Sequence, residues 1–229
     1  MEETEFWSNF EIIRSDVDKA IETFYSYISM HNIASDNKNI YHAINRNPTF
    51  WNITLYSLQS TFFITIGRIF DDGKDAHSVH KLISSALSHP EFFSKEALAN
   101  RKSAGKEKPT WLEKYLENAF EPGIADLREI KKCIKPYRKL FDNSYKDIRN
   151  AVFAHTIATE KDDVSQLFGK TNISEIEDIL YTLHDMLKAM WELYNNGRKL
   201  EFGKSSKEYR NRIEKTTYEV LQTIVNEKT

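Results

Sequence analysis

The chain has 229 residues, with 32 Lys and Arg against 34 Asp and Glu, so its formal net charge is only −2. This length can bury a sizeable core in one large domain or two small ones. The near-neutral charge excludes binding of nucleic acid by bulk electrostatics, so any such contact must come from a local patch. The single cysteine, Cys133, excludes an internal disulfide framework and a zinc site built on cysteines.

The beginning of the chain, MEETEFWSNFEIIRSD, is acidic and amphipathic, which is unlike a secretory signal peptide. No apolar run approaches the roughly 20 residues that a helix needs to span a bilayer. We therefore expect a cytoplasmic protein without a membrane partner.

Helices dominate the predicted elements, because the chain has only 7 glycines and 5 prolines. The first 30 residues predict a long helix, since their apolar residues recur in steps of three and four. A loop or short helix follows. A second apolar stripe begins at Asn47-Pro48, a typical helix start, and ends at the DDGKD turn. Its aromatic and β-branched residues leave a strand possible, but its length and spacing favour a helix.

Turn and capping signals divide the middle of the chain into shorter predicted helices. One helix is expected to open at His77 or Ser78, and another at the capping box of Thr110 and Glu113. Breaks are expected at His89-Pro90, at the basic loop 101–109, at 121–123 and, as a break or kink, at Pro136.

The last third predicts a loop after residue 155 and then two helices. Ser174 and Glu177 form a capping box before a clear apolar stripe that stops at Gly197. Ser205 and Glu208 are expected to cap the final helix. The chain shows neither an internal repeat nor an alternating strand pattern, so the predicted fold class is all-α.

One stretch, IRNAVFAHT at 148–156, places polar residues beside an apolar stripe. On a regular helix, one face carries Tyr145, Ile148, Val152 and His155. Arg149 lies beside that face, about 9 Å from His155 along the axis, so the two side chains can converge on one phosphodiester. The plain alternative is that His155 caps the helix end while Arg149 pairs with a carboxylate such as Asp147.

The segment RNAVFAH resembles the Arg…His signature of the HEPN superfamily (higher eukaryotes and prokaryotes nucleotide-binding domain), with Asn150 at its polar position. The upstream segment LYSLQSTFFITIGRIFDDGKDAHSVHKLI resembles a helix and turn of the abortive-infection, AbiU-like branch. The resemblance is strongest over 45–195. It implies a single all-α HEPN-like domain over 1–229, with extra N- and C-terminal helices, the latter an accessory helix at 206–227.

The resemblance implies a homodimeric, metal-independent endoribonuclease of prokaryotic phage defence or of a toxin–antitoxin system, with the motif helices paired at one cleft. His155 would act as general acid or base, Arg149 would hold the phosphate, and Asn150 would orient either group. RNA is the expected substrate, an antitoxin protein is a possible partner, and no cofactor or metal is expected. Some toxin members carry a tyrosine two residues after the histidine, where this chain has Ile157.

Two other functions stay open. The chain could be a silent HEPN module that binds nucleotide, RNA or protein, or a structural bundle in which Arg149 and His155 only cap and pair. Expression toxicity that depends on His155 would favour the enzyme.

The resemblance also assigns Arg68, Asp71 and Lys146 to substrate binding. For Arg68, the alternative is a surface salt bridge to Asp71 or Asp72. A basic run leads toward the motif and serves either to steer RNA or as a solvated helix face: Lys131, Lys132, Lys135, Arg138 and Lys139. A metal site is not expected at the histidine pair His77 and His80, since no zincin motif accompanies it.

Overall fold

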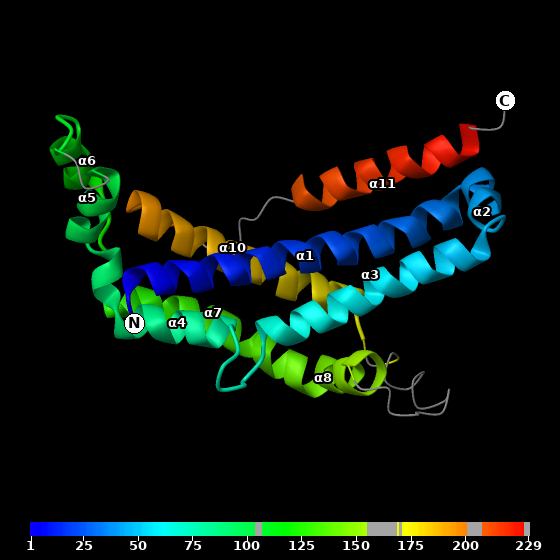
Figure 1. Ribbon diagram of the computed structural model, residues 1–229, viewed down its shortest axis with the longest axis horizontal. Coiled ribbons are helices and arrows are strands. Elements are labelled where there is room, and N and C mark those ends of the chain that lie inside the picture. The colour runs from blue at the N-terminus through cyan, green and yellow to red at the C-terminus, as the bar shows by residue number, and fades with distance from the viewer. Residues whose placement is uncertain (104–106, 155–168, 170, 201–207, 227–229) are drawn as a thin grey trace.

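The computed structural model describes residues 1–103, 107–154, 169, 171–200 and 208–226, and these residues form helices joined by loops, without a strand among them (Figure 1). The α-helices are α1 (Glu3–Asp36), α2 (Lys38–Ile44), α3 (Pro48–Ile69), α4 (Val79–Ser88), α5 (Lys95–Ser103), α6 (Leu112–Asn118), α7 (Ile124–Leu140), α8 (Lys146–Ile148), α10 (Ile173–Asn196) and α11 (Glu208–Asn226). Three further segments are the 3-10 helix η1 (Pro90–Phe93) and the π-helices η2 (Phe141–Tyr145) and η3 (Arg149–Ala154). The predicted all-α fold is confirmed.

Helices α1 and α3 form a long hairpin closed by α2 (Figure 1). The apolar stripe predicted for the first helix is buried, with Phe6, Phe10 and Val17 at most 1% exposed. The second stripe is helical from Pro48 onward, so the alternative of a strand there is wrong. Both long helices therefore bury an apolar stripe, which is what stabilises helices of this length in water.

The core lies where α3, α10 and α4 pack against α1, and α7 packs in turn on α4 and α10. Leu183 and Met186 of α10 are fully buried, and burial of each such side chain contributes about 1.5–3 kcal/mol. Helix α10 ends as predicted at Gly197, whose φ of 56° is left-handed and therefore suits glycine. A Cβ atom there would lie 2.8 Å from Leu98, so the turn also needs glycine for space.

The C-terminal helix α11 packs on the outer side of α1 and against α2. Leu221 and Ile213 are its buried residues, at 1% and 8% exposure. Among the described helices, none is long and apolar enough to cross a membrane.

Three local predictions about helix ends are wrong. The break expected at Pro136 is absent, since helix α7 continues through this residue. The carbonyl that loses its usual donor belongs to the exposed residue Lys132, so it can bond to water. Helix α6 begins with Trp111 at its cap, since the Leu112 amide bonds to the backbone of residue 109 instead of to Thr110. The cap of α10 is Asn172, whose side chain accepts the Ser174 amide, and the predicted cap Ser205 lies outside the described residues.

Candidate functional site

The described part of the motif, Arg149–Ala154, belongs to one uninterrupted helical segment, which runs from α7 through η2, α8 and η3. A π-helix is wider than an α-helix, so the motif does not keep the regular period assumed from the sequence. Tyr145 and Ile148 are buried as predicted, and Val152 is partly buried. Phe153 also packs on α3, with its ring stacked on Phe63 at 5.1 Å. His155 lies outside the described residues.

Tyr145 ties the motif segment to the beginning of α10. Its hydroxyl lies 3.3 Å from the Asn172 carbonyl and 3.3 Å from the Glu175 carboxylate, and it accepts the Asn172 amide at 3.4 Å. Burial raises the pKa of this hydroxyl to about 12, so Tyr145 stays neutral and can donate a proton. The two chain segments that flank residues 155–168 are thereby held together.

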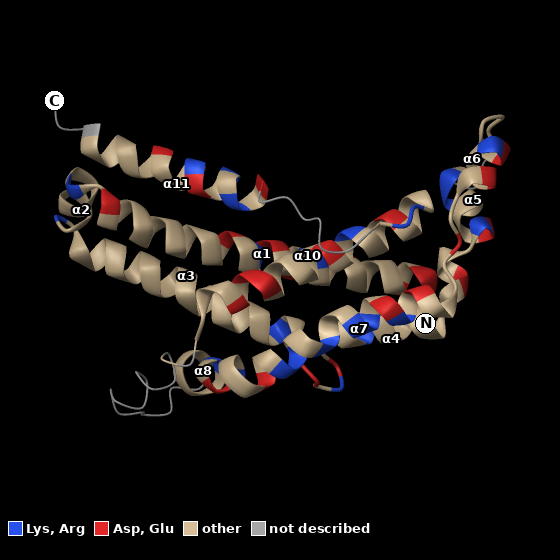
Figure 2. Cartoon of the chain, turned by 180° about the vertical axis from the view of Figure 1, so that it is seen from behind, with Lys and Arg blue, Asp and Glu red and all other residues tan. Residues whose placement is uncertain are grey.

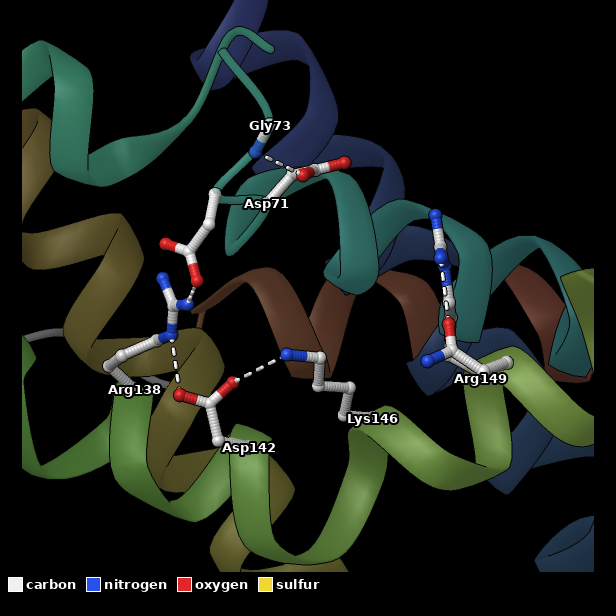
Figure 3. Close-up of polar contacts among 8 residues, drawn as sticks. Asp71, Gly73, Arg138, Asp142, Lys146 and Arg149 are labelled. Atoms are coloured by element: carbon white, nitrogen blue, oxygen red, sulfur yellow. Dashed lines mark hydrogen bonds and ion pairs between the residues drawn. The ribbon is translucent and has the colours of Figure 1, made fainter.

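Arg149 passes directly over α3 at Gly67. A Cβ atom on Gly67 would lie 2.8 Å from the Arg149 Nε and 2.9 Å from its Cγ. The guanidinium donates from Nη1 to the Asn150 side-chain oxygen at 2.8 Å (Figure 3), while Nε is buried without a hydrogen-bond partner in the described part of the chain. Among the described residues, no carboxylate pairs with Arg149, so nothing there neutralises its charge. An uncompensated guanidinium of this kind suits an incoming phosphate.

Arg68 pairs with α1 and not with its own neighbours. It forms a two-pronged ion pair with Asp16, a carboxylate only 7% exposed, instead of the predicted local pair with Asp71 or Asp72. Successive helical residues point about 100° apart, so Arg68 projects away from the face on which Gly67 meets Arg149. The structure therefore does not bring Arg68 and Arg149 together on one face of α3.

Asp71 and Asp72 begin the loop after α3, and they have different partners. Asp71 accepts the Gly73 amide at 2.7 Å, which closes a tight turn. Asp72 binds Arg138 of α7, and this hydrogen bond lowers the pKa of Asp72 below its ordinary value. Arg138 also binds Asp142 at 2.8 Å (Figure 3). The loop is thus fastened to the segment that carries the motif.

Lys146 lies one turn before Arg149 and 3.7 Å from Asp142 (Figure 3). Figure 2 shows Lys and Arg gathered along α7, where the basic run predicted from the sequence lies. Its four lysines are exposed, whereas the Arg138 side chain is only 13% exposed and serves the ion pairs just described. Lys146 and the exposed lysines therefore provide positive charge that leads toward Arg149.

The two histidines after α3 have different surroundings. The Nδ1 atom of His77 lies 2.6 Å from the Asn9 side-chain oxygen. His80 is half-buried, and this burial lowers its pKa. Within the described part of the chain, no group of three or more potential metal ligands comes together.

Sequence reasoning missed Gly67 and the pair of ion pairs at Arg138. An isolated glycine inside a helical pattern is less favourable than alanine, so Gly67 was the one local signal that another group approaches α3 there. Nothing local in the sequence indicates that Arg138 meets Asp72, because the two residues are 66 positions apart.

Comparison with known proteins gives one family. The HEPN_AbiU2 family model, which describes AbiU2, matches residues 6–216. No curated protein and no solved structure gives a significant match. The match spans the hairpin of α1 and α3, the loop after α3, the motif segment and α10. The chain therefore belongs to the AbiU2 family of HEPN domains.

Proposed function

We propose that the chain is a metal-independent endoribonuclease that works as a homodimer. The observation that carries the proposal is the state of Arg149: in a HEPN domain, this motif residue is held by Gly67 and Asn150 and by no carboxylate of the described residues. A cation that is oriented but not neutralised is what phosphate binding requires.

In the proposed reaction, the 2′-oxygen of a ribose attacks the adjacent phosphorus while the bond to the 5′-oxygen breaks. His155 takes the 2′-hydroxyl proton while water protonates the leaving 5′-oxygen, or it protonates that oxygen while water takes the 2′-hydroxyl proton. Arg149 stabilises the charge that grows on the phosphate oxygens, and Asn150 keeps the guanidinium oriented. The products are a 2′,3′-cyclic phosphate and a 5′-hydroxyl, and no step requires a metal.

The proposed dimer interface includes an exposed apolar stripe on α3. Phe50, Ile53 and Tyr56 follow one another at helical spacing and are 61%, 62% and 57% exposed. The Tyr56 ring also contacts Phe153 of η3 at 6.0 Å, so the stripe continues into the motif segment. An apolar surface of this kind supports an interface, because monomeric proteins seldom expose one.

The exposed lysines of α7 and Lys146 are proposed to guide the RNA backbone toward the motif. Such contacts are electrostatic, so binding is expected to weaken as salt rises. Arg68 and Asp71 are proposed to contribute to substrate binding indirectly, by placing α3 and the loop after it. Arg68 already pairs with Asp16, and Asp71 already accepts the Gly73 amide.

The proposed biological role is phage defence by abortive infection, or toxicity that an antitoxin protein restrains. A silent module that binds RNA or nucleotide is the second candidate, because family membership alone does not show activity.

Controlled expression in a bacterial host separates the two candidates. Wild-type protein is expected to stop growth and to fragment cellular RNA, whereas His155→Ala is expected to do neither at equal protein level. Equal growth and intact RNA with both proteins would support the silent module.

A further inference from the structure

Gly67 lies on the buried side of α3, near the C-terminal end of that helix. Glycine inside a helix is less favourable than alanine, because it has more backbone freedom to lose on folding. A glycine at this position therefore needs a reason in its surroundings.

The side chain nearest to Gly67 is that of Arg149. The three atoms nearest to a Cβ built on it are the Nε, Cγ and Cδ of Arg149, at 2.8, 2.9 and 3.2 Å. Carbon atoms are in van der Waals contact at about 3.5–4.0 Å, so a methyl group cannot occupy this space while Arg149 stays in place. The missing side chain is thus a notch into which the stem of the arginine fits.

We propose that Gly67 is a positioning residue that sets the direction of Arg149, so that the arginine meets a phosphate only through the Nη end of its guanidinium. This inference rests on the proposed function for the identity of the ligand, an RNA phosphodiester. A guanidinium can present either its two Nη atoms or the edge formed by Nε and one Nη. The second edge is closed here, since Nε is buried against α3 and has no hydrogen-bond partner among the residues that the structure describes.

Asn150 completes the arrangement from the other side. Its side-chain oxygen accepts from Nη1 at 2.8 Å, so the guanidinium is held at both its stem and its end. Two fixed points determine the direction of a planar group, which lowers the entropy lost on phosphate binding. Gly67 and Asn150 therefore act together on one cation, from α3 and from η3.

A double-mutant cycle in melting temperature tests the contact without requiring any activity. Gly67→Ala alone is expected to melt no higher than wild type, because the new methyl group displaces Arg149. In an Arg149→Ala background the notch is empty, so the same change is expected to raise the melting temperature, as alanine does in helices. An equal rise in both backgrounds would overturn the proposal.

The direction of Arg149 can be followed separately by NMR, through the Nε–H signal of the ¹⁵N-labelled full chain. This signal is assigned as the one that is missing from the spectrum of Arg149→Lys. Wild type is expected to give a signal protected from exchange with solvent, and Gly67→Ala a signal that has moved and lost protection. An unchanged, protected signal in the variant would show that Gly67 does not position the arginine.

Cleavage of RNA then connects position to function. Gly67→Ala is expected to lower the rate at saturating RNA by about 100-fold, as expected for a misplaced catalytic group. If wild type cuts no RNA, the proposed function fails, while the melting cycle and the Nε–H signal still decide the role of Gly67. Full cleavage by a folded Gly67→Ala protein would contradict the inference.

Discussion

Arg149 is placed by neighbours that carry no charge. Its stem lies on the backbone at Gly67, and its Nη1 donates to the amide oxygen of Asn150. A carboxylate at either place would form an ion pair and compete with phosphate, since opposite charges in contact attract by a few kcal/mol even near a protein surface. Gly67 and Asn150 therefore leave the positive charge of Arg149 available to a ligand.

The contrast between two substitutions of Asn150 tests this reading. Asn150→Asp keeps an oxygen acceptor but adds a charge 2.8 Å from Nη1, so it is expected to lower single-turnover RNA cleavage by at least ~100-fold. Asn150→Ala removes the acceptor without neutralising the arginine, and a loss nearer tenfold is expected. Equal activity of Asn150→Asp and wild type would contradict the role given to the free charge.

The sequence names the motif residues, whose catalytic roles stay predictions, but it does not name their contacts. The order of Arg149, Asn150 and His155 follows from local spacing alone. The contact with Gly67 depends on which helix crosses the motif and at what height, and this is settled by the packing of the whole bundle. The same reason explains why Arg68 pairs with Asp16, far away on α1, and not with the local carboxylates Asp71 or Asp72.

At the scale of elements, the ion pairs of Arg138 connect the loop after α3 to the motif segment. Arg138→Met is expected to destabilise the protein by about 1–3 kcal/mol, mainly because the partly buried Asp142 loses its hydrogen-bond donor and keeps only the longer contact with Lys146. The exposed pair between Lys132 and Glu129 offers a control, and Lys132→Met is expected to cost less than about 0.5 kcal/mol. Chemical denaturation of both variants provides the measurement, and equal stability of the two would show that the Arg138 network does not hold the loop.

His80, near the beginning of α4, predicts a pH dependence of stability. Burial lowers its pKa below the ordinary value of 6.5, Arg138 and Lys131 lower it further, and Asp72 and Asp142 oppose them. Below pH 6.5, His80 is protonated in the unfolded chain but still neutral in the folded chain. The free energy of unfolding therefore falls as the pH is lowered, until the pH reaches the lower pKa of the folded state. Melting curves between pH 5 and 8 are expected to show a shallower decline for His80→Gln than for wild type. Parallel curves would contradict the prediction.

Helical periodicity predicted the long elements well and their irregularities poorly. The stripes of α1, α3 and α10 were readable, because one face of each helix is buried along its whole length. The two π-helical stretches and the passage of α7 through Pro136 were not readable. Such irregularities depend on whether the backbone N–H and C=O groups that lose their usual helical partners can bond to other groups or to water. The pattern of apolar residues carries no information about this.

At the scale of the whole molecule, the AbiU2 fold places an apolar face of α3 beside the motif segment. Helix α3 has a single charged residue, Arg68 at its end, and Figure 2 shows the rest of this helix almost without charge. A surface of this composition next to a candidate active site fits a cleft shared by two copies of the chain.

Removal of the apolar stripe tests the proposed dimer. Substitution of Phe50, Ile53 and Tyr56 by serine is expected to convert a dimer into a monomer in sedimentation, and to lower RNA cleavage at least tenfold if the cleft needs both copies. The matched control is Tyr218→Ser with Val220→Ser, which changes exposed apolar residues of α11 far from the motif. If the triple serine variant still sediments as a dimer, the interface does not include this stripe of α3.

The central claim is metal-independent cleavage of RNA at His155 and Arg149, and the ends of the products test it most directly. Purified wild-type protein and His155→Ala are incubated with total RNA in excess EDTA, and the new ends are mapped. We expect cutting by wild type alone, with 2′,3′-cyclic phosphates and 5′-hydroxyls at the new ends. Cutting that stops in EDTA, ends that carry 5′-phosphates, or equal cutting by His155→Ala would contradict the account.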